Sequence, residues 1–429
     1  MVYPNSEDLR RQRARRLEDA ILCKKPDRVP FWASISYFAA RYANITYHEY
    51  DFDYDKNFNA VVKTAMAFDF DMLRAGFGGV FVPFPPIFFD EEADVTPLMR
   101  LGFGTVHDIL GDKYTKWAGR ELEANTPSQI AYVDLPYMKT EEYDELIKDP
   151  VSFFGEKLIP RTFTGLKRLG SPKSYSTLVR LGVEVSKIMD YTEKLKVALR
   201  DLGYPQFPVL PGVFIHPLDF IADSLRGHSN LMVDLFRIPD KVMAAVDVIL
   251  DLAKKKIRLS KGFWEKMPPD IKATFDSQLV TGSMPLHLNE MLSPRFFEKF
   301  FWEPLKAIVN EALKAGVIIN IFFEGDFTPF LKYLTELPKA SIIAYFEKTD
   351  LRKAREIIGD RLAIMGGVPA SLLISGTYSK VYEETCKLLN DVKEPGGFLF
   401  SGTGVSIPNE TKPENLKAAI EAVKKFGVY

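Results

Sequence analysis

The sequence predicts an α/β fold of the (β/α)8 TIM barrel class, with one long insertion between the second and third strands. Short apolar runs bounded by turn residues alternate with longer helical patterns, which is typical of β/α units around a parallel sheet. This alternation is regular from residue 207 onward. The 429 residues, 46% of them hydrophobic, suffice for one large core. We therefore expect a single barrel domain over residues 1–429.

Eight strands are predicted from apolar runs next to Gly, Pro, Asp or Ser. Their ranges are Val29–Ser34, Asp71–Gly76, Phe207–Ile215, Lys272–Leu279, Val317–Phe323, Ser341–Phe346, Leu362–Gly366 and Gly397–Ser401. Apolar residues at helical spacing predict helices in the gaps between and after the later strands. These helices are Lys241–Trp264, Arg295–Ala315, Leu351–Ile358, Tyr378–Leu389 and Pro413–Phe426.

Residues 77–206 interrupt this alternation. The segment Pro83–Pro86 begins a stretch rich in proline and aromatic residues, which predicts loops and a hairpin. Residues 140–203 have a mostly helical pattern. We expect this insertion to cover the mouth of the barrel.

Charge and cysteine content exclude several classes of protein. The formal net charge is −1, so no basic surplus indicates a nucleic-acid partner. No run of about 18 apolar residues predicts a membrane span. Cys23 and Cys386 are far apart and form no Cys-x-x-Cys motif, which favours a reducing cytoplasm. The basic stretch Ser6–Leu17 predicts an amphipathic helix capped by Ser6, rather than a membrane or RNA arm.

Three residues that follow predicted strands are candidates for chemistry, because TIM barrel enzymes keep reactive groups at the carboxyl ends of their strands. Glu324 directly follows the strand Val317–Phe323, so its carboxylate needs a cation, a metal or a proton. His287 is expected in a loop. Its imidazole serves there as a metal ligand, as an acid–base group or as an anchor of the loop. His216 either binds substrate or caps the following helix.

A second group of candidates lies near the first strand. Tyr37, Arg41 and Tyr42 are expected to line the pocket floor, with Arg41 as the anchor for a carboxylate. Asp276, placed within the fourth predicted strand, is expected to orient Arg41 or to handle protons.

Several segments resemble the uroporphyrinogen decarboxylase superfamily. Ala40-Arg41-Tyr42 is similar to its Gly-Arg-Tyr, and Phe275-Asp276-Ser277 matches the Phe-Asp-Ser of the decarboxylase. The order of the matching segments adds specificity. The others are Lys25–Pro30, Gly402-Thr403-Gly404-Val405 and Pro413-Glu414-Asn415. The resemblance implies a TIM barrel and a homodimer.

The departures from the decarboxylase are informative. Tyr37 replaces one of its arginines, Gly76 falls where its essential aspartate stands, and Thr403 replaces its late histidine. Because that substrate carries many carboxylates and needs several cations, turnover of uroporphyrinogen itself is not expected. The zinc methyltransferases of the superfamily carry His-x-Cys where this chain has Phe322 and Glu324, which excludes a sulfur-rich zinc site.

A branch that acts on aryl methyl ethers resembles this chain more closely. The similar segments are Phe322–Gly325, Phe346–Asp350 and Gly366–Pro369, although Tyr345 stands where that branch offers histidine. The resemblance implies a zinc site on Glu324 and His287. It also implies that the substrate is positioned by Tyr345, Thr403 and the candidates near the first strand. A corrinoid partner protein is then expected to accept the methyl group.

Three functional hypotheses follow. The leading one is a methyltransferase that moves a methyl group from a small, aryl ether-like donor to a corrinoid partner, with a metal as Lewis acid. The second is a metal-free decarboxylase or lyase, in which Arg41 binds a carboxylate and Asp276 or Glu324 handles protons. The third is a non-catalytic protein that binds a corrinoid or tetrapyrrole.

Overall fold

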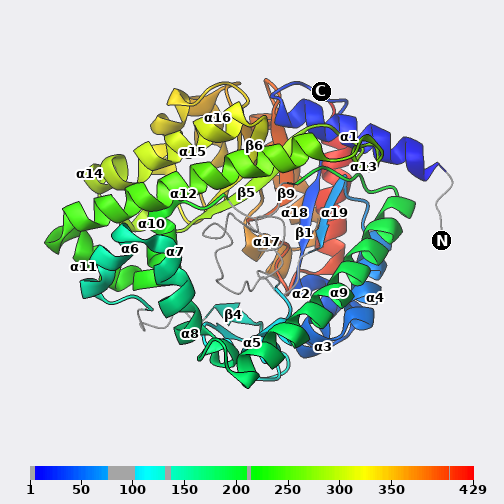
Figure 1. Cartoon of the computed structure of the whole chain (residues 1–429). Helices are drawn as coiled ribbons and strands as arrows, with labels where there is room; N and C mark the ends of the chain where they lie inside the picture. The colour runs from blue at the N-terminus through cyan, green and yellow to red at the C-terminus, as the bar shows by residue number, and fades with distance from the viewer. Residues whose placement is uncertain (1–4, 76–101, 131–136, 210–213, 405) are drawn as a thin grey trace.

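The computed structural model describes residues 5–75, 102–130, 137–209, 214–404 and 406–429 (Figure 1). Gly76, the Pro83–Pro86 stretch and Val405, which carry sequence predictions, lie outside these residues. Among the described helices, none combines the length and the apolar character needed to cross a bilayer.

Within the described residues, seven parallel strands form the wall of a TIM barrel. They are β1 (Trp32–Ile35), β2 (Met72–Ala75), β5 (Val280–Leu286), β6 (Val317–Phe323), β7 (Ile342–Phe346), β8 (Ala363–Gly367) and β9 (Phe398–Gly402). Strands β5 to β9 pair in chain order, and β1 pairs with β2. A parallel bridge between Phe31 and Phe400 joins the β9 edge to the β1 edge. The predicted fold class is confirmed, and β6 has the predicted bounds.

Two predicted strands differ from the structure. In the described part of Phe207–Ile215, only Val209 pairs, through a parallel bridge to Thr281. The fourth strand begins at Val280, so Lys272–Leu279 was wrong: helix α13 (Pro269–Lys272) and turns occupy that segment. Gly282 and Pro285 interrupt the apolar run of β5, and this is why the sequence pattern misplaced it.

Helices surround this wall. They are α1 (Ser6–Ile21), α2 (Tyr37–Ala43), α3 (Tyr47–Phe52), α4 (Tyr54–Ala67), α5 (Gly104–Leu110), α6 (Tyr143–Lys148), α7 (Pro150–Ser152), α8 (Ile159–Thr162), α9 (Pro172–Asp201), α10 (Pro217–Phe220), α11 (His228–Arg237), α12 (Pro239–Lys266), α14 (Pro294–Phe296), α15 (Glu303–Lys314), α16 (Leu351–Ile358), α17 (Ala370–Ser375), α18 (Tyr378–Val392) and α19 (Pro413–Phe426). The predicted helices are confirmed, although the π-helical turn η8 (Phe297–Trp302) separates α14 from α15.

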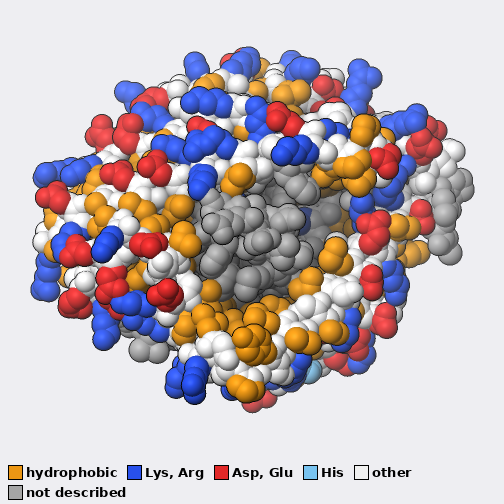
Figure 2. Space-filling model, viewed as in Figure 1, with side chains coloured by type: hydrophobic (Ala, Val, Ile, Leu, Met, Phe, Trp, Pro, Cys, Tyr) orange, Lys and Arg blue, Asp and Glu red, His pale blue; other side chains and the backbone are white. Residues whose placement is uncertain are grey.

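The segment between β2 and β5 contains the hairpin of β3 (Thr115–Lys116) with β4 (Gln129–Ile130), and is mostly helical over 140–203, as predicted. Its longest helix, α9, packs against α4 and α5 along one side of the molecule (Figure 1). Whether this segment covers the barrel mouth stays a prediction. Acidic and basic side chains are interspersed over the face seen in Figure 2.

The amino end of the barrel is closed by α1. Leu17 and Ile21 belong to the same apolar cluster as the interior strand residues Ile318, Ile343 and Leu399. Alternate strand residues face inward, whereas the outward ones pack against the helices. The interior is therefore filled at the amino end, and reactive groups are left to the carboxyl end.

Arginines of α1 hold that closure. Arg16 donates to Asp71 at 2.5 Å and to both oxygens of Asp27, and Arg10 donates to Asp276 at 2.5 Å. The predicted helix is thus confirmed, but its basic residues make ion pairs with the barrel. Its cap position is Asn5, not Ser6, and this residue makes no side-chain cap bond.

Candidate active site

Three titratable residues follow three neighbouring strands at the carboxyl end. His287, Glu324 and Glu347 come directly after β5, β6 and β7, whose last residues are paired in register. Each is two positions beyond an inward-facing residue, so each lies on the interior side of the wall. The structure therefore brings the predicted pair of Glu324 and His287 together and adds Glu347.

Backbone contacts fix the loop that carries His287. The N–H groups of His287 and Leu288 donate to one oxygen of Asp219, at 2.8 and 2.9 Å. The side chain of Asn289 donates to the carbonyl of Glu324 at 2.8 Å, which ties the ends of β5 and β6 together. The imidazole and the carboxylate are thus held on well-anchored backbone.

The imidazole of His287 lies between two carboxylates. Its Nδ1 is 2.8 Å from Asp223 Oδ2, and its Nε2 is 3.4 Å from Glu324 Oε2. Burial disfavours the charged ring, but the hydrogen bond and charge of Asp223, with the charges of Asp219 and Glu324, outweigh it. They raise the pKa of His287 to about 9. The ring is therefore a cation at neutral pH.

Asp223 was missed by the sequence analysis. It lies on the π-helical turn η6 (Ile221–Arg226) and accepts from His287 on one oxygen and from His228 Nε2, at 2.8 Å, on the other. Burial opposes its ionisation, yet these two histidines lower the pKa of Asp223. The hydrogen bond to Asp223 likewise raises the pKa of His228. We call Asp223, His228, His287 and Glu324 the mouth cluster.

Glu324 has the opposite tendency to Asp223. Burial raises the pKa of Glu324, and the negative charges of Glu347 and Asp223 raise it further against the attraction of His287. About half of its side-chain surface, 51%, stays exposed. Glu347 accepts from the Gly325 N–H at 2.8 Å. The mouth thus combines a cationic imidazole with a carboxyl group biased towards holding a proton.

Asp276 does not belong to this site. It precedes β5 at the amino end of the barrel, where it accepts from Arg10 and from the Gln206 N–H at 2.8 Å. The expected contact with Arg41 and the expected catalytic role were wrong. The predicted fourth strand was misplaced, and this put Asp276 at the wrong level along the barrel axis. Charged pairs at this end of a TIM barrel serve stability.

The candidates near β1 also have other roles. The Tyr37 hydroxyl, on a side chain that is 2% exposed, donates to Asp51 at 2.7 Å and accepts from the Ser128 N–H. Tyr42 packs on Phe38 and Phe68 between α2 and α4. The expectation that Tyr37 lines a pocket floor was therefore wrong, whereas for Tyr42, which is half-buried, it stays a prediction. Arg41 is exposed on α2, and its anchoring role stays a prediction.

His216 is a structural residue. It is 1% exposed, its Nε2 donates to the Phe301 carbonyl at 2.9 Å, and its Nδ1 accepts from the Asp219 N–H. The sequence left open whether His216 caps a helix or binds substrate. The cap is confirmed, and both ring nitrogens are engaged, which contradicts substrate binding. Thr403 is also buried and donates to the Ser406 carbonyl at 3.1 Å.

Tyr345 does face the barrel interior. It belongs to the interior apolar cluster and packs edge-on against Phe322, with ring centroids 5.2 Å apart. Burial raises the pKa of its hydroxyl, so this group is neutral and able to donate. Its predicted role towards substrate stays a prediction.

The predicted zinc site is incomplete in the described chain. His287 Nδ1 is held by Asp223, which leaves Nε2 and the Glu324 carboxylate as two potential ligands. Catalytic zinc usually has three protein ligands. Among the described residues, no group of three or more His, Cys, Asp or Glu side chains is arranged to hold a metal ion. These residues alone do not fit a zinc centre, and we assign no step to a metal.

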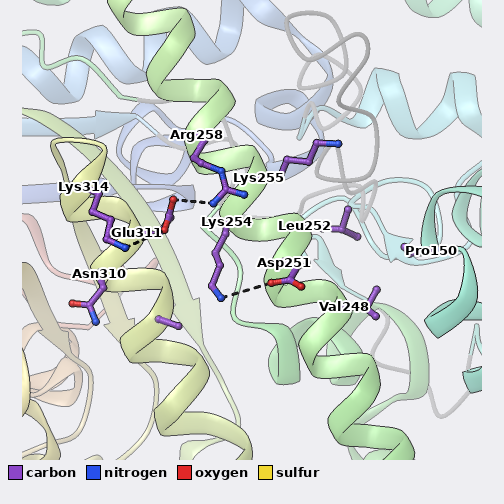
Figure 3. A pocket seen from close by; sticks show the side chains of 11 residues that line it. Pro150, Val248, Asp251, Leu252, Lys254, Lys255, Arg258, Asn310, Glu311 and Lys314 are labelled. Carbon is purple, nitrogen blue, oxygen red and sulfur yellow. Dashed lines mark hydrogen bonds and ion pairs between the residues drawn. The ribbon is translucent and has the colours of Figure 1, made fainter.

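A groove of about 880 Å³ lies on the outside of the barrel between α12 and α15 (Figure 3). Arg258 of α12 donates to Glu311 of α15 at 2.9 Å and so pairs charges across the groove, whereas Lys254 lies 3.7 Å from Asp251 on α12 itself. None of the predicted site residues is among the described residues that line it. The groove is separate from the mouth cluster.

Comparisons with known proteins agree with this architecture. A sequence profile described as Uroporphyrinogen decarboxylase (URO-D) matches residues 212–426, just over half of the chain. Uroporphyrinogen decarboxylases of three Coxiella burnetii strains are 26% identical over 141 residues, which cover 32% of this chain and 38% of those enzymes. A methyltransferase from Methanosarcina mazei has a similar fold, with a TM-score of 0.58 at 15% identity over 96% of this chain and 98% of that one. The chain belongs to the uroporphyrinogen decarboxylase family.

Proposed function

We propose that this protein is an enzyme that transfers a methyl group from a small, aryl ether-like donor to the corrinoid of a partner protein. The observation that carries the proposal is the cationic His287, held between Asp223 and Glu324 at the carboxyl end of the barrel. A proton donor at this place meets the main chemical difficulty of ether cleavage, which is the poor leaving group.

The reaction breaks the bond between the methyl carbon and the ether oxygen. The electron pair of that bond stays on the oxygen, the methyl group goes to the nucleophilic acceptor, and His287 or protonated Glu324 donates a proton to the oxygen. Asp223 keeps Nδ1 of the ring occupied, so Nε2 is the nitrogen that faces Glu324 and the substrate. His228 shares the charge of Asp223 from the other side.

The direct test uses purified protein with cob(I)alamin as the methyl acceptor and 4-methoxybenzoate as the donor. We expect methylcobalamin and 4-hydroxybenzoate in equal amounts. His287→Gln should slow the reaction roughly 100-fold or more, the usual contribution of a positioned proton donor. His48→Gln is the matched control, because His48 lies outside the mouth cluster and contacts the Ala118 carbonyl.

A second function is favoured by the stretch that is similar to uroporphyrinogen decarboxylases. In a metal-free decarboxylase, the His287 cation would protonate the carbanion left by carbon dioxide. Carbon dioxide release from an aryl carboxylate by the purified protein without any corrinoid, and no methylcobalamin, would favour that function. Tight corrinoid binding without turnover, unchanged in Glu324→Gln, would favour the non-catalytic alternative.

Zinc and a homodimer also remain proposals. Zinc content of the purified protein, with the effect of added zinc on methyl transfer, tests the first. Sedimentation of the purified chain tests the second.

A further inference from the structure

An arginine lies inside the barrel where the sequence analysis expected no functional group. Arg74 is on β2, paired in register with Ser34 of β1. Met72, two positions earlier, packs on the interior cluster, whereas Leu73 belongs to the outer core. Because strand side chains alternate, Arg74 faces the interior.

This arginine differs from the buried arginines of the described chain. Those each bind carboxylates or backbone carbonyls, and they are Arg13, Arg16, Arg226 and Arg355. Arg74 makes no hydrogen bond or ion pair with any described residue. Arg74 is nevertheless exposed to solvent, so its guanidinium is accessible to a ligand. A guanidinium is always charged and presents a planar fork of donors, so an accessible guanidinium without a protein partner is suited to bind an anion.

The surroundings of Arg74 favour an aromatic anion. Tyr345 interacts electrostatically with Arg74, and its ring forms a pair with Phe322 on the interior wall. Ser283 and Pro285, on the inward face of β5, are exposed, so the interior is open to solvent on that side. Asn320 Oδ1, also inward, is buried without a hydrogen-bond partner and is able to accept from a ligand.

The interior of an eight-stranded barrel holds side chains or one small ligand. Arg74 on β2, and His287 and Glu324 after β5 and β6, all lie on the interior side of the wall. A planar carboxylate matches the guanidinium through two parallel hydrogen bonds. A donor held at one end by Arg74 would therefore present its other end to the mouth cluster.

We infer that Arg74 is the anchor for a carboxylate on the substrate, so that the substrate is a small aryl carboxylate rather than a neutral ether. The identity of the reacting end rests on the proposed function, whereas the anchor itself does not. Arg41, the anchor expected from the sequence, lies on helix α2 and not at an inward-facing position of a strand.

The test compares two probes of similar shape by calorimetry with the full-length protein, 4-methoxybenzoate and the neutral 4-methoxybenzamide. Wild-type protein should bind the acid roughly tenfold tighter or more. Arg74→Gln should abolish that preference and leave the affinity for the amide within about threefold, and Arg74→Lys should keep part of it. Arg352→Gln is the matched control, because that arginine pairs with Asp391 on the outer helices.

Equal affinity of the wild type for acid and amide would overturn the anchor, and this comparison needs no variant to fold. A full preference for the acid in folded Arg74→Gln would also overturn it. The assay contains no methyl acceptor, so it fails independently of the proposed function. A preference for the acid without methyl transfer would refute only the function, and methyl transfer from the neutral ether without that preference would refute only the anchor.

Discussion

Replacing Asp223 with asparagine removes the charge that holds His287 in its cationic form. The rise of the His287 pKa from 6.5 to about 9 corresponds to roughly 3 kcal/mol of preference for the charged ring. Burial acts in the opposite direction and remains in the variant, whereas Asp219 and Glu324 retain part of the attraction. We therefore expect the pKa of His287 in Asp223→Asn to fall to about 6.5 or below.

Nuclear magnetic resonance titration of the imidazole signals measures this change directly. The chain has five histidines, and His48, His107 and His216 have no contact with Asp223, so they serve as internal controls in the same sample. A pKa of His287 that stays near 9 in the variant would refute the assignment of Asp223 as its main partner. A parallel fall in the control histidines would show that the fold, and not one ion pair, had changed.

The same pair makes stability depend on pH in a defined direction. Between 6.5 and about 9 the folded His287 holds a proton that the unfolded residue has lost, so the free energy of unfolding decreases as pH rises through this window. The contribution is fully present below 6.5 and is lost above 9. Wild-type protein should therefore lose more thermal stability than Asp223→Asn between pH 6.5 and 9. An equal loss in both proteins would contradict the linkage.

Three further variants test predictions about stability. Asp276→Asn should lower the free energy of unfolding by roughly 2–3 kcal/mol, because it leaves Arg10 unpaired at the closed amino end of the barrel. The affinity for 4-methoxybenzoate should not change. A loss of that affinity at unchanged stability would contradict this prediction. Gly367→Ala should cost about 3 kcal/mol or more, since its Cβ would lie 2.1 Å from the Gly402 carbonyl oxygen. Gly182→Ala, with open space around it on α9, should stabilise by about 0.5–1 kcal/mol, and equal melting temperatures of the two variants would refute the packing argument.

Local sequence patterns predicted much of the fold for identifiable reasons. Strand β6 is a continuous run of β-branched and aromatic residues, and its predicted bounds are confirmed. Helix α16 has the predicted bounds because it is strongly amphipathic and ends at Gly359, whose φ of 62° favours glycine. These signals lie within one element and need no knowledge of the rest of the chain.

The errors arise where the arrangement depends on distant parts of the chain. Gly282 and Pro285 interrupt the apolar run of β5 and made it read as a loop, yet β6 pairs with it along its full length. That error moved Asp276 from the amino end of the barrel into the expected site. Asp223 gave no local signal, because its contact with His287 arises only when η6 meets the end of β5. The inward position of Arg74 likewise depends on how β2 pairs with β1. Correct bounds for β5 would have put His287 directly after a strand. That position would have drawn attention to Asp219 and Asp223, which follow His216, as its partners.

The central claim is that His287 donates a proton to the leaving oxygen, and the dependence of rate on the leaving group tests it most directly. Methyl transfer to cob(I)alamin is measured for a series of aryl methyl ethers whose phenols span a range of pKa values. The account predicts that His287→Gln slows the most basic leaving groups by roughly 100-fold or more and the least basic ones, such as nitrophenols, only slightly. An equal loss across the whole series would contradict it, because a group that only shapes the site has no reason to distinguish them.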